Sequence, residues 1–199
     1  MKHQLVECED IYFEISKQKH KHGAFHFKDK NSDTEIFVLN GKIHKTNGPA
    51  RIRYHSNGRI QSEEYFINGE IHRLDGPADI EYYKDGDVKS EIYYQNNEVH
   101  RENGPAEIEY YKNGNVEAEH YFTHDLYHRE NAPAIIIYHK NRNIRHQVYF
   151  TNNLRNNENG PAETLFSKNG KIEKELYYLN GKPYSKEDYQ KQIQTKLYW

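Results

Sequence analysis

The stretch ARIRYHSNGRIQSEEYFING, residues 50–69, decides the fold. Apolar and polar residues alternate on both sides of Asn57-Gly58, and the stretch ends in a second pair, Asn68-Gly69. Asn-Gly between alternating runs is a strong hairpin signal, because both central positions of a type I′ turn need positive φ. We therefore expect a type I′ hairpin at the first pair and a second chain reversal at the other.

A two-residue loop fixes which residues face each other across the hairpin. It would place Tyr54 opposite Gln61 and would also place Ile52 opposite Glu63. Residues two apart in a strand share a face, so an apolar face follows. Its members in successive copies are Ala50, Ile52, Tyr54 and Tyr65; Ala78, Ile80, Tyr82 and Tyr93; Ala106, Ile108, Tyr110 and Tyr121; Ala134, Ile136, Tyr138 and Tyr149; and Ala162, Thr164, Phe166 and Tyr177.

Three markers repeat along the chain with one period of 28 residues, as from Gly48 to Gly76. Gly-Pro-Ala starts at Gly48, Gly76, Gly104 and Gly160, with Ala132-Pro133-Ala134 in the remaining place. The corner at Asn57-Gly58 recurs as Asp85-Gly86, Asn113-Gly114, Asn141-Arg142 and Asn169-Gly170, and the corner at Asn68-Gly69 recurs as Asn40-Gly41, Asn96-Asn97, His124-Asp125, Asn152-Asn153 and Asn180-Gly181. Such periodicity is typical of repeat proteins, whose units bury each other's faces by stacking.

The repeats predict an all-β, elongated, single-layer twisted antiparallel sheet of tandem hairpins. We place an N-terminal cap at residues 1–23, and one degenerate repeat followed by five regular repeats at residues 24–184. Residues 185–199 are expected to form a short C-terminal capping helix, because Ser185 and Asp188 resemble a capping box. Apolar residues then follow at a helical spacing of four: Tyr189, Ile193 and Leu197.

The composition of the 199 residues excludes several classes of protein. Aromatic residues make up 14% of the chain and 18 residues are Tyr, which argues against disorder despite a mean hydropathy of -1.16. A net charge of -2 gives no general attraction to nucleic acid or acidic membranes. The single cysteine, Cys8, forms no disulfide framework, and no apolar run is long enough to cross a membrane. We expect a soluble cytoplasmic protein.

Several segments resemble MORN-type repeats, in the variant found in many bacterial and large-virus proteins. The resemblance covers about residues 24–184 and rests on the pattern aromatic-x-x-Asn-Gly. Segments that carry it are Tyr65-Phe66-Ile67-Asn68-Gly69, Tyr177-Tyr178-Leu179-Asn180-Gly181 and the run Asn-Gly-Arg-Ile-Gln-Ser-Glu at 57–63. The resemblance implies an elongated antiparallel sheet of hairpins and roles in protein assembly or lipid contact. It implies no catalytic residues.

The polar feature that most suggests a binding site is a column of histidines, each followed by Lys or Arg. Its members are His44-Lys45, His72-Arg73, His100-Arg101 and His128-Arg129, and the fifth copy reads Asn156-Asn157. Three interpretations stand beside each other: a metal site, an anion or RNA site, and a structural role within each repeat. Equivalent side chains in successive repeats are translated by about 9–10 Å and do not converge, which disfavours a metal. The structural role is favoured.

The fourth repeat departs from the others. Ala132 and Arg142 stand in the places of glycines, and the repeat is locally apolar and basic. If it is specialised, its binding patch comprises Ile135, Ile137, His139 and Arg145, of which the first three share one strand parity. A column of carboxylates at Glu63, Glu91, Glu119 and Glu175 predicts cross-strand ion pairs rather than catalysis.

The sequence therefore predicts a non-enzymatic scaffold or adaptor that binds another protein along the repeat sheet. Periodicity without a unique polar cluster motivates this prediction, and no catalytic residue, metal site or cofactor is expected. The alternative is a binder of nucleic acid or anionic lipid that uses the His-Arg column.

Overall fold

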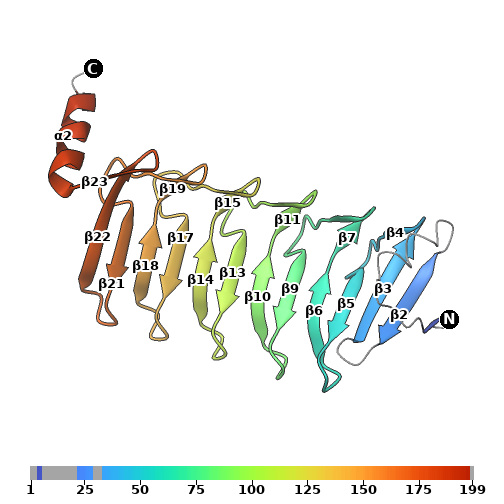
Figure 1. Ribbon diagram of the computed structural model, residues 1–199. Helices are drawn as coiled ribbons and strands as arrows, with labels where there is room; N and C mark the ends of the chain where they lie inside the picture. Colours follow the sequence, from blue (N-terminus) through green and yellow to red (C-terminus); the bar gives the residue numbers. More distant parts are fainter. Residues whose placement is uncertain (1–3, 6–21, 29–32, 198–199) are drawn as a thin grey trace. The chain divides into compact units, whose positions relative to one another are not determined.

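The computed structural model describes residues 4–5, 22–28 and 33–197. The chain divides into two compact units, Met1–Glu98 and Val99–Trp199. Strands in both units follow one another in chain order, and Figure 1 shows the hairpins of each unit side by side. The predicted fold class, antiparallel β-hairpins followed by a C-terminal helix, is confirmed.

In the first unit, neighbouring strands of the main sheet follow the order β1-β2-β3-β5-β6-β9-β10, and β4 pairs with β3. The short strands β7 and β8 form a separate ribbon, and β1 pairs with β2 in parallel, whereas the other pairs are antiparallel. The strands are β1 (Gln4–Leu5), β2 (Gly23–Lys28), β3 (Asp33–Leu39), β4 (Lys42–Ile43), β5 (Arg51–Tyr54), β6 (Ile60–Glu64), β7 (Phe66–Ile67), β8 (Glu70–Ile71), β9 (Asp79–Tyr82), β10 (Val88–Ile92) and β11 (Tyr94–Gln95), with β12 (Glu98–Val99) at the boundary.

In the second unit, the main strands follow the order β13-β14-β17-β18-β21-β22-β23. Two ribbons, β15 with β16 and β19 with β20, stand beside them. The elements are β13 (Glu107–Tyr110), β14 (Val116–His120), β15 (Phe122–Thr123), β16 (Leu126–Tyr127), β17 (Ile135–Tyr138), β18 (Ile144–Val148), β19 (Phe150–Thr151), β20 (Leu154–Arg155), β21 (Glu163–Phe166), β22 (Ile172–Leu179), β23 (Lys182–Tyr184) and α2 (Lys186–Leu197).

The corner at Asn57-Gly58 is not the expected type I′ turn. Gly58 has a positive φ of 79°, whereas Asn57 is not among the residues with positive φ. Gly58 N–H donates to the carbonyl of His55, and His55 N–H donates to the carbonyl of Arg59, both at 2.8 Å. These bonds close a three-residue loop with a bulge at its end. The Oδ1 of Asn57 accepts the N–H of Arg59 at 3.1 Å, so the asparagine closes the loop with its side chain.

The bulge changes the register next to the turn. Tyr54 lies opposite Ile60 instead of Gln61, because the loop is one residue longer than expected. Gln61 is then the extra residue of the bulge and has no partner in β5. The predicted pairing of Ile52 with Glu63 is confirmed further from the corner. The same shift recurs in the hairpins β9–β10, β13–β14, β17–β18 and β21–β22.

The second series of corners has the backbone of a type I′ turn. Asn68 and Gly69 have φ of 53° and 87°. Three later copies place a non-glycine residue at the second position, where its side chain accepts a backbone N–H of the preceding repeat. These acceptors are Asn97 Oδ1 for Ile71 N at 2.8 Å, Asp125 Oδ1 for Val99 N at 2.7 Å and Asn153 Oδ1 for Tyr127 N at 2.7 Å. This hydrogen bond offsets part of the cost of a left-handed backbone.

The alanine that ends each Gly-Pro-Ala copy, and the one that ends Ala132-Pro133-Ala134, is completely buried. These residues are Ala50, Ala78, Ala106, Ala134 and Ala162, each with 0% exposure. Ala78 shows the reason: its N–H donates to the carbonyl of Ile92, and its carbonyl accepts the N–H of Tyr65, both at 2.8 Å. The alanine thus lies between strands of two successive repeats, and its small side chain suits this crowded position.

Large apolar clusters lie near both ends of the described chain. The first joins Phe25, Ile36, Val38, Ile43, Ala50 and Phe66. The degenerate repeat therefore contributes core, and Phe25 pairs with Ile36 across β2 and β3. Most of the predicted N-terminal cap, residues 1–23, lies outside the described residues.

The C-terminal cluster is formed by α2. Ser185 Oγ accepts the N–H of Asp188 at 3.1 Å and donates to its carboxylate at 3.1 Å, which confirms the predicted capping interaction. Tyr189 then packs against Tyr177 and Leu179. The helix therefore covers the last hairpin, as expected, and residues 198–199 of the predicted range lie outside the described residues.

Candidate functional site

The histidines of the His-Arg column connect successive repeats. In each case Nδ1 accepts the backbone N–H of the first residue of the next type I′ corner. The pairs are His44 with Asn68 at 3.0 Å, His72 with Asn96 at 3.1 Å, His100 with His124 at 3.4 Å and His128 with Asn152 at 3.3 Å. An imidazole that accepts at Nδ1 carries its proton on Nε2. The column thus forms structural links.

The fifth copy keeps this link with another side chain. Asn156 Oδ1 accepts the N–H of Asn180 at 3.0 Å, so an amide oxygen replaces the imidazole nitrogen. His22 makes the same contact with Asn40 at 3.4 Å. Sequence reasoning missed His22, because it precedes His44 by fewer than 28 residues.

The basic residues of the column fold back onto their own repeat. The guanidinium of Arg73 lies 4.1 Å from the ring centroid of Tyr65, and its Nη1 donates to the carbonyl of Pro77 at 3.2 Å. Arg129 repeats both contacts, with Tyr121 at 3.7 Å and with the carbonyl of Pro133 at 3.2 Å. Arg101 Nη1 donates to the carbonyl of Pro105 at 3.1 Å. Each arginine therefore stabilises the loop that contains the proline of its own repeat.

The carboxylate column accepts hydrogen bonds from tyrosine. The Tyr82 hydroxyl donates to Glu63 at 2.7 Å, and the Tyr138 hydroxyl donates to Glu119 at 2.9 Å. Burial, followed by the hydrogen bond to the carboxylate, raises the pKa of Tyr82 and of Tyr138 above the ordinary value. The expected cross-strand ion pairs are thus replaced at Glu63 and Glu119 by bonds from a neutral donor in the next repeat.

The structure brings together only part of the patch predicted in the fourth repeat. Ile135 and Ile137 share a face of β17, on which both are half-buried. His139 lies in the corner after β17, where its Nε2 is 3.0 Å from the carbonyl of Phe166. His55 makes the equivalent contact with the carbonyl of Tyr82 at 3.0 Å. His139 therefore has a structural contact that an ordinary repeat also makes.

Arg145, the fourth member of that patch, is exposed on β18. It lies at the bulge, between Ile144, which faces Tyr138, and His146, which faces Ile137. Arg145 therefore has no cross-strand partner in this register and is not grouped with the isoleucines.

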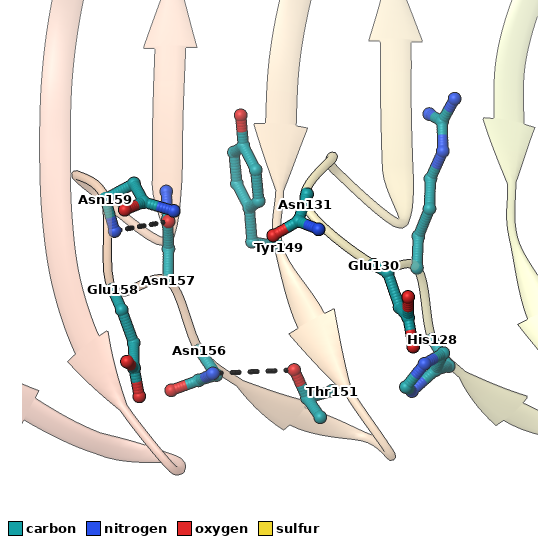
Figure 2. A pocket seen from close by; sticks show the side chains of 10 residues that line it. His128, Glu130, Asn131, Tyr149, Thr151, Asn156, Asn157, Glu158 and Asn159 are labelled. Carbon is teal, nitrogen blue, oxygen red and sulfur yellow. Dashed lines mark hydrogen bonds between the residues drawn. The ribbon is translucent and has the colours of Figure 1, made fainter.

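A pocket of about 470 Å³ opens in the second unit, between the loops of the fourth and fifth repeats. Figure 2 shows Tyr149 standing between the loop that carries Asn131 and the loop that carries Asn157. The pocket is lined by His128, Arg129, Glu130, Asn131, Tyr149, Thr151, Asn156, Asn157, Glu158 and Asn159. Sequence reasoning named His128 and Arg129 as candidate binding residues and noted Tyr149 and Asn156-Asn157, but it did not bring these residues together in one site.

The pocket exists where the His-Arg column is broken. Tyr149 is the counterpart of Tyr65 and Tyr121, whose rings are covered by arginine. Asn157 takes the place of that arginine, and its Nδ2 donates to the carbonyl of Pro161 at 2.9 Å. Asn157 therefore keeps the bond to proline, but within the described chain no lysine or arginine lies over the ring of Tyr149.

The pocket is bordered by two carboxylates. Glu158 forms an ion pair with Lys196 of α2 at 2.6 Å. Glu130 is exposed and has no hydrogen bond or ion pair with any described residue. α2 is held near this loop by a further bond, from the Tyr189 hydroxyl to the carbonyl of Asn157 at 3.0 Å. The pocket thus combines the uncovered ring of Tyr149 with one carboxylate that has no partner among the described residues, Glu130, and it is also lined by Arg129.

Other features of the described residues bear on function. No three His, Cys, Asp or Glu side chains of residues 4–5, 22–28 and 33–197 gather in a way that could hold a metal ion. The part of the chain with assigned structure contains no helix that is both long enough and apolar enough to cross a bilayer. Comparison of the sequence with known proteins finds no matching family model and no matching curated protein.

Proposed function

We propose that this protein is a MORN-type repeat scaffold that binds another protein and catalyses no reaction. The observation that carries the proposal is the pocket beside Tyr149, where two successive loops leave about 470 Å³ open. Elsewhere the polar side chains of the column are used to hold repeats together. A partner that inserts side chains between these loops would gain contacts that the chain does not supply itself.

The alternative, binding of nucleic acid or anionic lipid through the His-Arg column, receives less support. Phosphate binding needs cationic groups that are free to reach the ligand. Arg73 and Arg129 instead cover tyrosine rings and donate to proline carbonyls. Binding to RNA or to acidic vesicles that weakens steeply with salt would favour the alternative.

We also propose that the protein acts in the cytoplasm, since a single cysteine provides no intramolecular disulfide. Fractionation of the native cell checks this proposal. Recovery with an extracellular or membrane fraction would contradict it.

Affinity purification of the full chain from its native cell, followed by mass spectrometry, tests the scaffold proposal. We expect one protein to be recovered in stoichiometric amount and to bind again as a purified component in size-exclusion chromatography. Recovery of RNA, lipid or a tightly held small molecule without a protein partner would contradict the proposal. A covalent change in that small molecule during incubation would contradict the assignment as a non-enzyme.

A further inference from the structure

We propose that the pocket beside Tyr149 receives the guanidinium group of an arginine from the partner protein. The proposal rests on the scaffold function and identifies the chemistry of its partner at one site. It starts from a comparison between copies of the same repeat within one chain.

In other repeats, the ring equivalent to Tyr149 is covered by a cationic side chain of the chain itself. Arg73 lies 4.1 Å from the ring centroid of Tyr65, and Arg129 lies 3.7 Å from that of Tyr121. Lysine takes the role in the degenerate repeat and after the last hairpin. These pairs are Lys45 over Phe37 at 3.5 Å and Lys186 over Tyr177 at 5.8 Å. The loop architecture therefore places a cation over this ring in several chemical forms.

Asn157 removes the cation from the fifth copy without collapse of the loop. Its amide donates to the carbonyl of Pro161 at 2.9 Å and its Oδ1 accepts the N–H of Asn159 at 2.9 Å. Both bonds keep the loop folded. The short side chain lacks the guanidinium that covers the equivalent rings, and the space left between the loops is the pocket.

Two carboxylates border the pocket, and its one lining arginine, Arg129, is already held over Tyr121 and bonded to the carbonyl of Pro133. Glu130 is exposed and has no partner among the described residues, and Glu158 is shared with Lys196. A guanidinium can stack on an aromatic ring and donate in its own plane to a carboxylate at the same time. Arginine is the expected occupant because arginine covers the equivalent ring in regular repeats, at Tyr65 and at Tyr121.

A peptide titration tests the inference. The probe is acetyl-Gly-Arg-Gly-amide, compared with the peptides that carry citrulline or lysine, and binding is followed by NMR on the labelled full chain. We expect the arginine peptide to shift the side-chain amide signals of Asn131, Asn157 and Asn159. We expect citrulline, which is neutral, to bind at least about tenfold more weakly. Equal binding of the citrulline or lysine peptide, or shifts confined to other residues, would overturn the proposal.

Variants of the pocket supply matched controls. Asn157→Arg should fill the pocket from within and abolish peptide binding while the chain stays folded. Tyr149→Phe keeps the ring and should retain binding, whereas Tyr149→Leu should lose it by at least about tenfold. Glu130→Gln should weaken binding, and Glu102→Gln, at the equivalent place one repeat earlier, should leave it unchanged. Unaltered binding by folded Asn157→Arg or Tyr149→Leu would refute the assignment.

The native partner separates this inference from the scaffold proposal. If a purified partner binds the unmodified chain and Asn157→Arg equally well, the arginine pocket is wrong while the scaffold function stands. If the arginine peptide fills the pocket but no protein partner exists, the scaffold function is wrong. Loss of the partner with Asn157→Arg alone, and not with Glu102→Gln, supports both.

Discussion

The Nδ1 atom of His72 accepts a hydrogen bond from the backbone N–H of Asn96 at 3.1 Å. The two residues belong to successive repeats, so this bond joins the loop of one unit to the corner of the next. Asn156 makes the same bond to Asn180 with an amide oxygen. The shared geometry shows that the position requires an acceptor and does not specifically require an imidazole.

Replacement of His72 tests this role. His72→Ala should lower the free energy of unfolding by about 1 kcal/mol, because the Asn96 N–H loses its protein acceptor. His72→Asn should cost less than about half of that, since asparagine already serves the fifth copy. Urea unfolding of both variants measures the difference. Equal destabilisation by the two replacements would show that the hydrogen bond is not the contribution of His72.

Asp79 predicts a dependence of stability on pH. Burial, followed by the neighbouring carboxylates of Glu64 and Glu81, raises its pKa from 3.8 to about 6, while Arg53 and Arg51 act in the opposite direction. The raised pKa means that the folded chain holds the proton more strongly than the unfolded chain. The contribution is therefore full below the unfolded pKa of 3.8 and is lost as pH rises through about 6.

The difference between the original chain and Asp79→Asn isolates this effect. Unfolding free energies between pH 4 and 7 should show a relative loss of about 1–3 kcal/mol for the original chain as pH rises, because one pKa unit corresponds to about 1.4 kcal/mol. Asp87→Asn, at an exposed position, serves as the control and should keep the slope. A slope that survives in Asp79→Asn would assign the effect to another group.

The corner residue Asn153 combines a left-handed backbone with an acceptor side chain. Its φ is 63°, and its Oδ1 accepts the N–H of Tyr127 at 2.7 Å. Asn153→Ala should lower the unfolding free energy by about 1–2 kcal/mol, because the hydrogen bond is lost and alanine tolerates this backbone poorly.

Two replacements at the same corner serve as controls. Asn153→Asp should be nearly neutral, since Asp125 makes the same bond to Val99 in the preceding repeat. Asn153→Gly loses the hydrogen bond but removes the strain of a side chain at positive φ. Its stability should therefore lie between those of the alanine and aspartate variants. Thermal unfolding ranks the three variants. A variant with alanine that is as stable as the one with aspartate would contradict the proposed role of the side chain.

Deletion of a whole period tests the repeat architecture. Removal of residues 124–151 brings Asn152 to the place of His124, where its N–H meets the Nδ1 of His100 as His124 does now. We expect a folded, shorter protein with a cooperative transition. Removal of the half period 124–137 should prevent folding, because corners and faces then fall out of phase. Circular dichroism and thermal unfolding compare the two, and identical behaviour would contradict the model of stacked repeats.

Much of the fold follows from the sequence because the period fixes equivalent positions. The completely buried Ala78 and the pairing of Ile52 with Glu63 both agree with the alternation of the repeat. The type of the corner at Asn57 could not be predicted from the pair Asn-Gly, which occurs at both kinds of corner. Loop length depends on backbone bonds around the pair, such as that from His55 to the carbonyl of Arg59.

The candidate site was less accessible to sequence reasoning. The sequence marked His128 and Arg129 as part of a column, and it also showed that the fifth copy reads Asn156-Asn157. Each arginine covers a ring eight residues earlier, as Arg73 covers Tyr65. This contact depends on how the chain reverses at the short two-stranded ribbon, such as β7–β8. Without that register, the loss of arginine at Asn157 could not be linked to the exposure of Tyr149.

The forward bonds from His72 and its equivalents also bear on how such a chain can change by recombination. A duplicated segment of one period contains one histidine acceptor and one corner N–H. The acceptor bonds to the corner of the next repeat, and the corner N–H bonds to the acceptor of the repeat before it. Unequal crossing-over within the gene can therefore add or remove ordinary copies without leaving a corner N–H or its acceptor unpaired. The pocket beside Tyr149 is different. A single crossover that replaced Asn157 by the arginine found in neighbouring repeats would remove the pocket.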